Sequence, residues 1–137
     1  MNDPERNKKL LNDIFARLAE GNAALLVESM DDTIRWTTPG PGRWGKTYEG
    51  KKAVVGDLLR TISSQLAAPY KARAVRIIAE GEHAVVEVRG AGNRTKAGVD
   101  YDNQYCWVCT LRDGKITSID EYCDTELITA AFGSPQG

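Results

Sequence analysis

The residues best suited to chemistry lie in one stretch, 101–124, which reads YDNQYCWVCTLRDGKITSIDEYCD. It contains one carboxylate, Glu121, that we expect to lie among apolar and aromatic side chains. Loss of water disfavours the charged form of such a carboxylate and raises its pKa toward the range useful for general acid–base catalysis. We therefore predict that Glu121 is catalytic. The alternative is a structural carboxylate that is hydrogen-bonded to Tyr105 or Arg35.

Further side chains could form a pocket around this acid. The phenol of Tyr105 could donate a hydrogen bond to a substrate carbonyl or oxyanion, and Asn103 could orient a polar group. Trp36 and Trp107 could line a pocket for a flat or bulky apolar ligand, with Ile119 beside the acid. Packing across strands or in the core is the alternative for each of these residues.

Two runs typical of strands, 103–111 and 115–123, flank the tripeptide Arg112-Asp113-Gly114. The runs are rich in β-branched and aromatic residues, and an Asp-Gly step between such runs is a strong hairpin signal. The turn type decides which side chains share a face of the sheet, because a slip of one residue exchanges the two faces.

Two turn types are possible here. A two-residue loop would place Trp107 beside Asp120. A three-residue loop with a glycine bulge would place Trp107 opposite Ile119 and Tyr105 opposite Glu121. We favour the three-residue loop, because it pairs apolar with apolar residues and leaves one acid on a mostly apolar face.

Cys106 and Cys109 form a C-x-x-C pattern, a spacing found in redox and zinc sites. Residues three apart in a strand point to opposite faces, so the two thiols would diverge. With Cys123 the chain has three cysteines, which leaves one unpaired in any disulfide scheme. We interpret them as small buried hydrophobes in a reduced, cytoplasmic protein, and we expect neither a metal nor a cofactor.

The 137 residues fit a single domain, 1–137, with a loose tail at 133–137. The formal net charge is −1, and Lys and Arg are scattered along the chain, which argues against nucleic acid as a partner. No apolar run approaches the ~20 residues that span a membrane. The polar N-terminal residues do not resemble a secretory signal. We expect neither a nucleic-acid nor a membrane partner.

The spacing of apolar residues predicts helices that share one buried surface. A first helix begins at a capping Asp3 followed by Pro4, and its apolar residues recur at helical intervals up to Leu18. The helix that opens at Gly50 repeats these intervals. Further helices are predicted at 23–30 and 126–131, and strands at 33–38, 70–79, 84–89 and in the hairpin. This order predicts an α+β fold, with helices against one face of a curved, mainly antiparallel sheet.

Residues 39–45, PGPGRWG, form a loop whose Pro and Gly content excludes regular structure. A long loop that carries a tryptophan is a candidate for a lid or a pocket rim. We expect Trp44 either to fill this role or to fold back over the core.

The order of elements, with residues 112–116 running into 120–124, resembles the SnoaL-like branch of the NTF2-like superfamily. Trp36, the Pro39-Gly40 step and the tripeptide 48–50 before the third helix fit the same pattern. The resemblance implies an NTF2-like cone in which a bent sheet wraps helices around a deep pocket. It also implies a homodimer through the outer face of the sheet.

Relatives of this kind include ketosteroid isomerases, polyketide cyclases, limonene epoxide hydrolases and non-catalytic binding domains, so the fold alone cannot fix the function. The isomerases use a tyrosine and two aspartates, at positions that match Ile14, Thr38 and Trp107 here. Their chemistry is therefore absent, and Thr38 is expected to line the pocket instead. The cyclases pair an acid with a pocket histidine, whereas His83 lies in a turn and is expected to be exposed.

The epoxide hydrolases use an acid–arginine–acid relay. Glu121 matches the final acid of this relay, but the other two positions fall near Val88 and Gly90, which cannot serve. Glu87 and Arg89 lie one residue away, on the opposite face, and are most simply part of a cross-strand ladder of ion pairs. A catalytic Glu87–Arg89 pair would require a different strand register.

Together these observations predict a cofactor-free enzyme of the isomerase, cyclase, lyase or hydrolase type. Its substrate would be an apolar or partly aromatic small molecule, with Glu121 as general acid or base. The alternative is a non-catalytic ligand-binding or accessory domain of the same fold.

Overall fold

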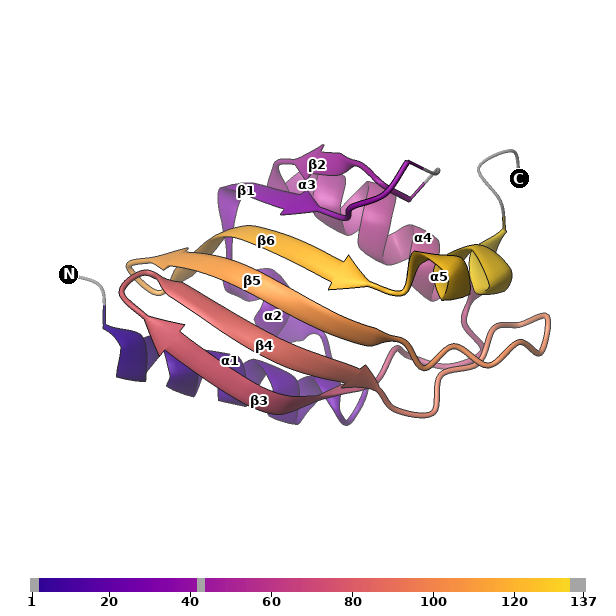
Figure 1. Cartoon of the computed structure of the whole chain (residues 1–137), viewed down its shortest axis with the longest axis horizontal. Helices are drawn as coiled ribbons and strands as arrows, with labels where there is room; N and C mark the ends of the chain where they lie inside the picture. Colours follow the sequence, from indigo (N-terminus) through magenta and orange to yellow (C-terminus); the bar gives the residue numbers. More distant parts are fainter. Residues whose placement is uncertain (1–2, 42–43, 134–137) are drawn as a thin grey trace.

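The structure is a computed structural model that describes residues 3–41 and 44–133. In these ranges six strands form one sheet in the order β2-β1-β6-β5-β4-β3 (Figure 1). The strands are β1 (Met30–Thr37), β2 (Thr47–Glu49), β3 (Ala72–Glu80), β4 (His83–Gly90), β5 (Gln104–Arg112) and β6 (Lys115–Cys123). Only β1 and β6 pair in parallel; the other described neighbours are antiparallel. The predicted α+β class with a mainly antiparallel sheet is confirmed.

Helices flank the strands in the order that the apolar spacing predicted. They are α1 (Pro4–Leu18), α2 (Ala24–Glu28), α3 (Lys51–Ala53), the π-helix η1 (Val54–Leu59), α4 (Arg60–Gln65) and α5 (Thr125–Phe132). The sequence did not predict β2 or the π-helix. None of the helices in the described ranges is long and apolar enough to cross a bilayer. The tail predicted at 133–137 lies, from residue 134 onward, outside the described residues.

The first helix begins where the sequence places its cap. The Asp3 side chain accepts hydrogen bonds from the backbone N–H groups of Glu5 and Arg6, which would otherwise lack partners in the first turn. The apolar stripe of α1 is buried against β3 and β4. The last residue of this stripe, Leu18, reaches the interior between the helices and the sheet.

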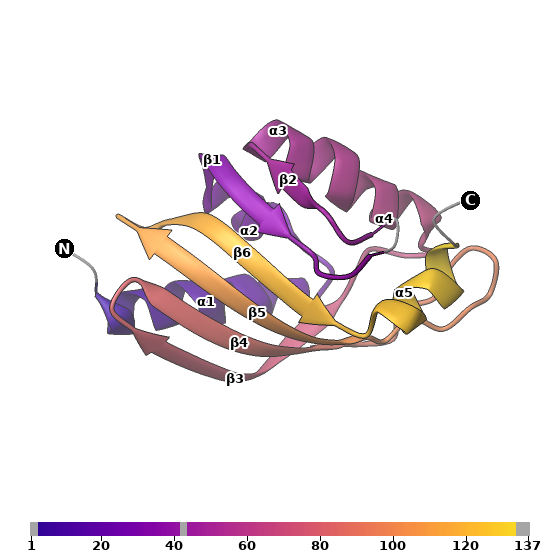
Figure 2. The ribbon, with the colours of Figure 1, turned by 45° about the horizontal axis from the view of Figure 1, so that its top comes forward.

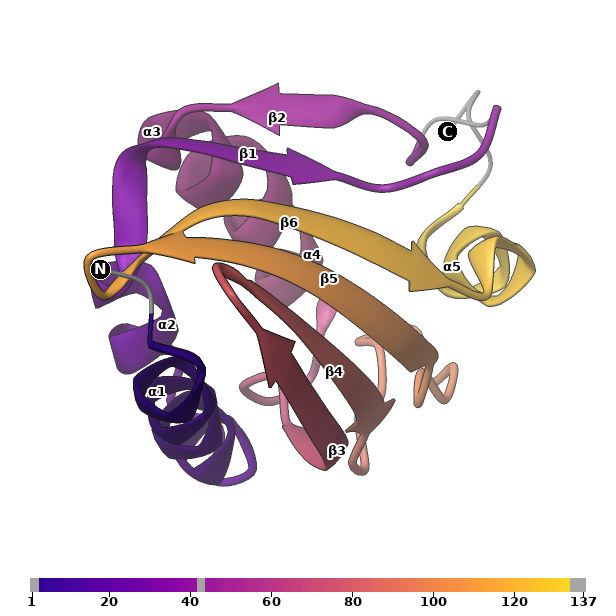
Figure 3. The same cartoon turned by 60° about the vertical axis from the view of Figure 1, so that its left-hand side comes forward.

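The sheet is bent, and the helices other than α5 lie on its concave side (Figures 2 and 3). Helix α1 packs against the β3–β4 end of the sheet, whereas α3 and η1 pack against β1 and β2. The two helical layers therefore close over the sheet from opposite ends. The space that remains between them lies over the middle strands, β5 and β6.

The helical stretch 51–65 contains a π-helical segment, η1, where one regular helix was expected. A π turn inserts one extra residue and rotates the side chains that follow, and such turns are frequent at functional sites. In η1, Val54 is buried against the core while Val55, Leu58 and Leu59 line the internal cavity. Because of the widened turn, this short segment contributes side chains both to the core and to the wall of the cavity.

The β5–β6 hairpin has a two-residue loop, so the predicted three-residue loop was wrong. Arg112 pairs with Lys115, and the loop residues Asp113 and Gly114 have φ values of 51° and 77°. Positive φ at both central residues is characteristic of a type I′ turn, which suits the twist of the flanking strands.

An irregularity between Thr110 and Leu111 then shifts the register of the hairpin. As a result Trp107 faces Glu121 and Tyr105 faces Cys123, where the sequence analysis placed Ile119 and Glu121 as their partners. The true pairing differs from the predicted one by two residues. Because side chains alternate with a period of two, this displacement leaves the same residues on the same face.

Candidate functional site

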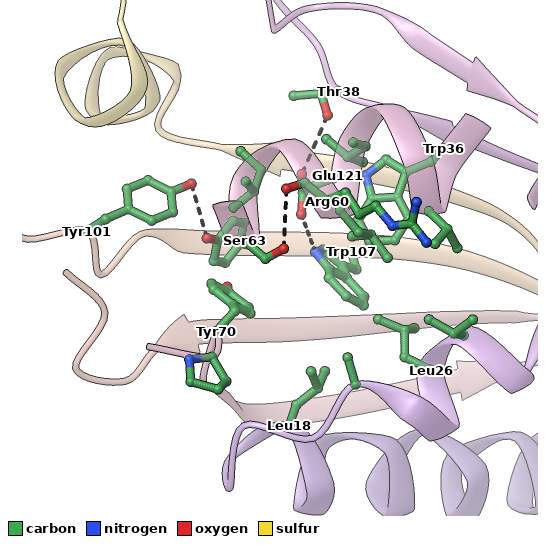
Figure 4. Close-up of a pocket in the computed structure, with 18 of the residues that line it drawn as sticks. Leu18, Leu26, Trp36, Thr38, Arg60, Ser63, Tyr70, Tyr101, Trp107 and Glu121 are labelled. Carbon is green, nitrogen blue, oxygen red and sulfur yellow. Dashed lines mark hydrogen bonds between the residues drawn. The ribbon is translucent and has the colours of Figure 1, made fainter. Parts of the chain in front are cut away.

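A cavity of about 290 Å³ lies between the concave face of the sheet and the helices (Figure 4). Its walls are largely apolar. The polar and charged side chains that interrupt them are Thr38, Arg60, Ser63, Tyr70, Tyr101, Tyr105 and Glu121, together with the indoles of Trp36, Trp44 and Trp107. A mostly apolar cavity with a few converging polar groups is typical of a small-molecule site.

Glu121 is the one carboxylate among the described residues that line this cavity. The indole N–H of Trp107, from the facing position on β5, donates a hydrogen bond of 2.9 Å to Oε2 of Glu121. The hydroxyl of Thr38, just beyond the end of β1, donates to Oε1 at 3.5 Å. The carboxylate is thus held between two strands and faces the cavity (Figure 4).

Burial raises the pKa of Glu121 to about 7, because the charged form loses the stabilisation that water gives it. The donors Trp107, Trp36 and Thr38 oppose this effect by stabilising the charged form. At neutral pH both the carboxylate and the carboxylic acid are therefore populated. A group in this state can take up a proton and return it.

The ring of Trp36 packs edge-on against Trp107, with the ring centroids 5.0 Å apart. Trp36 is 2% exposed, and its indole N–H finds no acceptor among the described residues. This N–H lies near enough to Glu121 to lower the pKa of that residue, although the two make no hydrogen bond of normal geometry. From the sequence, Trp36 was expected to form an apolar wall of the pocket or to fill the core.

Three phenols form a second polar group in the cavity. The hydroxyl of Tyr105 donates to that of Tyr101 at 3.1 Å, and the ring of Tyr70 meets Tyr105 edge-on at 6.5 Å. Burial raises the pKa of all three phenols, so they are protonated at neutral pH. Tyr105 is therefore in the cavity, as predicted, but its hydroxyl already has a partner.

Two of the predicted binding residues, Asn103 and Ile119, do not line the cavity. The Asn103 side chain donates to the backbone O of Asp124 at 3.0 Å and to the Tyr101 hydroxyl at 3.2 Å. Its Oδ1 accepts from the backbone N–H groups of Gln104 and Asp124. The buried side chain of Asn103 thus pairs with backbone groups of Gln104 and Asp124, just before α5. Ile119 is fully buried in the core.

Trp44 lines the cavity and is also buried, so it borders the pocket and packs against the core at the same time. Its ring packs against Phe132 at 6.0 Å, and its indole N–H donates to the backbone O of Gly133 at 3.4 Å. These contacts tie the loop after β1 to the end of α5. Part of the predicted loop, residues 42 and 43, lies outside the described residues.

The remaining candidates lie away from the cavity. Glu87 forms an ion pair of 3.0 Å with Arg76 of β3 on the outer face, as the ladder interpretation predicted. Arg89, the other predicted member of the ladder, forms none of the ion pairs found among the described residues and instead donates to the backbone O of Val88. His83 is exposed. In the described ranges the three cysteines are free thiols, but only Cys109 is buried as predicted, whereas Cys106 and Cys123 are half-buried. No cluster of three or more His, Cys, Asp or Glu residues in these ranges is arranged to hold a metal ion.

Four polar residues of the cavity were not predicted from the sequence: Tyr70, Tyr101, Arg60 and Ser63. Tyr101 could have been found, because it has the same strand parity as Tyr105 and Trp107. Arg60 and Ser63 lie one turn apart on α4, on the helix whose apolar stripe was assigned wholly to the core. Nothing in the local pattern distinguishes a stripe that faces a cavity from one that faces packed side chains.

A family model described as a SnoaL-like domain matches residues 11–119 of the chain. No curated protein matches the chain. Among solved structures, an NTF2-like protein from Burkholderia xenovorans LB400 is 24% identical, with a TM-score of 0.73, and the match covers 97% of this chain and 100% of that one. At this identity the likeness shows the NTF2-like fold alone.

Two further structures carry functional descriptions. A protein from Bacillus subtilis that is provisionally described as an isomerase is 22% identical, with a TM-score of 0.78 and 96% of each chain covered. A protein from Jannaschia sp. CCS1 that is provisionally described as a SnoaL-like polyketide cyclase is 15% identical, with a TM-score of 0.74, and 94% of this chain and 92% of that one are covered.

Proposed function

The chain belongs to the family of SnoaL-like domains, and from this premise we propose that it is an enzyme that moves a proton on an apolar small molecule. Glu121 is the general acid–base, and the reaction needs no cofactor. The observation that carries this proposal is the position of the Glu121 carboxyl in an apolar cavity, where burial raises its pKa to about 7. A base whose pKa lies near the working pH combines the reactive protonation state with sufficient basicity.

The proposed step is proton abstraction from a carbon next to a carbonyl group. The Glu121 carboxylate takes the proton, and the electron pair of the C–H bond moves to the carbonyl oxygen to form an enolate. If a C=C bond adjoins the reacting carbon, the enolate is a dienolate, and the same carboxyl returns the proton to its γ-carbon, which shifts the double bond and is an isomerisation. Alternatively, the enolate carbon attacks a second carbonyl carbon of the same molecule, which closes a ring, and the protonated Glu121 gives its proton to the alkoxide that this attack forms.

The polar groups of the cavity support this step. An enolate carries its charge on oxygen, and preorganised donors in a water-poor cavity stabilise such a charge strongly. The cavity offers indole and phenol donors at two places, near Glu121 and at the phenol group of Tyr70, Tyr101 and Tyr105. The apolar walls between them suit the body of a ring compound.

Isomerase and cyclase chemistry is favoured over the hydrolase type. A hydrolase of the epoxide kind needs a second acid and an arginine to activate water, and those positions fall near Val88 and Gly90. Val88 is fully buried in the core, and a side chain added at Gly90 would meet the backbone of Asp102 at 3.0 Å. A lyase step, in which the carbanion expels a neighbouring group, also needs only one base and fits the same cavity.

The proposal can be tested without the natural substrate. 2-Tetralone, a ring ketone with acidic C–H bonds, is incubated with the protein in D2O, and the exchange of its α-hydrogens is followed by NMR. We expect the wild-type protein and the control Glu20→Gln, at an exposed position, to catalyse exchange. In Glu121→Gln the enzymatic rate should be lower by at least about 100-fold. Undiminished exchange in Glu121→Gln would remove this residue from the mechanism.

A ligand-binding domain without catalysis is the second candidate. It is supported by the fact that both oxygens of the Glu121 carboxylate already have donors, as in a structural carboxylate. In this case Glu121→Gln would change ligand affinity, and the wild-type protein would not accelerate exchange in 2-tetralone. The exchange experiment therefore separates the two functions.

We further propose that the protein is a homodimer through the outer face of the sheet. This face carries exposed or half-buried apolar side chains, among them Ile78 (57% exposed), Tyr122 (53% exposed) and Val108. A second copy of the chain would remove them from water. The free thiols are consistent with the proposed cytoplasmic location.

A further inference from the structure

The Trp36 side chain carries a buried hydrogen-bond donor that the fold itself does not use. The residue is 2% exposed, and its indole N–H has no acceptor among the described residues. Nearly all buried polar groups in proteins are hydrogen-bonded, because an unpaired donor loses its contact with water without compensation. An unpaired donor at the wall of a cavity therefore points to an acceptor that enters the cavity.

The carboxylate of Glu121 lies close to the N–H of Trp36 but does not meet it in hydrogen-bond geometry. Its Oε2 accepts the indole N–H of Trp107, and its Oε1 accepts the hydroxyl of Thr38. Three donors thus surround one acid, and one of the three is unpaired (Figure 4).

We propose that the indole N–H of Trp36 binds an uncharged acceptor oxygen of the ligand beside Glu121, so that the cavity selects apolar ring ketones over the corresponding hydrocarbons. This inference rests on the proposed function, since it takes the cavity as the ligand site. A carboxylate at this position is disfavoured, because it would approach the Glu121 carboxylate in a medium of low polarity. A ketone oxygen accepts the hydrogen bond without bringing a second negative charge.

The position of this oxygen would also place the reacting carbon. Because the N–H of Trp36 lies close to the Glu121 carboxyl, a ketone that accepts this N–H would bring one of its α-carbons near the carboxyl. The same N–H then faces the oxygen on which enolate charge develops. Trp36 is thus a specificity-determining residue that contributes a donor as well as an apolar surface.

The test compares 2-tetralone with tetralin, which has the same ring system without the oxygen. Their dissociation constants are measured for the wild-type protein, for Trp36→Phe and for the control Trp44→Phe. Both substitutions remove an indole from the wall of the cavity, but the N–H of Trp44 already donates to Gly133. We expect Trp36→Phe to reduce the preference for the ketone over the hydrocarbon by about five- to tenfold, and Trp44→Phe to leave this preference within about twofold.

A second measurement uses the wild-type protein and does not depend on the folding of a variant. In a 1H–15N spectrum, the indole N–H resonance of Trp36 should move downfield when 2-tetralone binds and should not do so when tetralin binds. Binding of both compounds with no such difference, together with an unchanged preference in folded Trp36→Phe, would overturn the role of Trp36 and leave the proposed function standing. If neither compound binds to the wild-type protein, the cavity is not a ring-ketone site, and this inference fails together with that part of the proposed function.

Discussion

The indole N–H of Trp107 donates a 2.9 Å hydrogen bond to the carboxylate of Glu121 from the facing position on the neighbouring strand. This hydrogen bond depends on the strand register, because only the observed pairing of β5 with β6 places the donor and the acid opposite each other. The bond stabilises the charged form of an acid that burial otherwise drives toward the neutral form.

Replacement of Trp107 by Phe should therefore raise the pKa of Glu121 further above about 7, because the charged form loses a donor. Titration of the Glu121 side-chain carbon by 13C NMR would measure the change. Trp44→Phe is the matched control, because its indole N–H donates to Gly133. An unchanged or lowered pKa in Trp107→Phe would show that the bond does not hold in solution.

The raised pKa of Glu121 should make stability fall as pH rises. Below about 4.5 the acid is protonated in the folded and unfolded states alike, so it contributes no pH dependence. Between about 4.5 and 7 the folded state retains a proton that the unfolded state has lost, and folding becomes less favourable by on the order of 3 kcal/mol. Urea unfolding should show this loss in the wild-type protein and in Glu20→Gln but not in Glu121→Gln. Parallel curves for all three proteins would contradict the assignment.

The rate of catalysed exchange in 2-tetralone should increase with pH, whereas the free energy of unfolding decreases. The carboxylate form of Glu121 is the base, so the enzymatic rate should rise with pH and level off above about 7. The measurement is the exchange rate across pH 5 to 9, corrected for the rate without protein. A rate that falls over this range would indicate that the acid form is the one required.

Asn103 should act on stability and not on ligand affinity. Its side chain makes four hydrogen bonds, to backbone groups of Gln104 and Asp124 and to the hydroxyl of Tyr101, and the residue is 1% exposed. Asn103→Ala should lower the free energy of unfolding by about 2–3 kcal/mol, because four hydrogen bonds of a buried side chain are lost. Urea unfolding measures this loss. The affinity of the folded variant for 2-tetralone should stay within about twofold of wild type, and a much larger loss would restore Asn103 to the binding site.

The outer face of the sheet should support a dimer. Ile78→Glu places a charge on this face, on the edge strand β3, and should shift the protein to monomer in sedimentation experiments at micromolar concentration. Val99→Glu is the control, because Val99 is also exposed (37%) but lies in the connection between β4 and β5. A monomeric wild-type protein would refute the dimer directly.

Much of the architecture could be predicted from local signals. The capping of α1 by Asp3 and of α5 by Asp124 follows from short-range hydrogen bonds that the sequence specifies on its own. The apolar stripe of α1 and the alternation in β5 likewise reflect periods of 3.6 and 2 that are visible in the chain. The sequence did not reveal β2, because three residues are too few to establish a period.

The face on which Glu121 lies could also be predicted, although its partner could not. Strand alternation puts Tyr105, Trp107 and Glu121 on one side of the hairpin whenever the register changes by an even number of residues. The two-residue turn at Asp113-Gly114 and the irregularity after Thr110 together moved the pairing by two residues. The face of the sheet on which Glu121 lies was therefore predicted correctly, although the predicted strand register was wrong.

What the sequence determined by itself is the set of elements and the side-chain parity within each one, since both depend on interactions between residues close together in the chain. What only the tertiary structure decided is which groups meet. The bend of the sheet and the π turn in η1 leave a cavity where the sequence shows only apolar stripes. The unpaired N–H of Trp36 depends on the parallel pairing of β1 with β6, two strands that lie more than 70 residues apart. Long-range packing of this kind leaves no local trace, because it is fixed by the shapes of distant surfaces and by the desolvation they impose on one another.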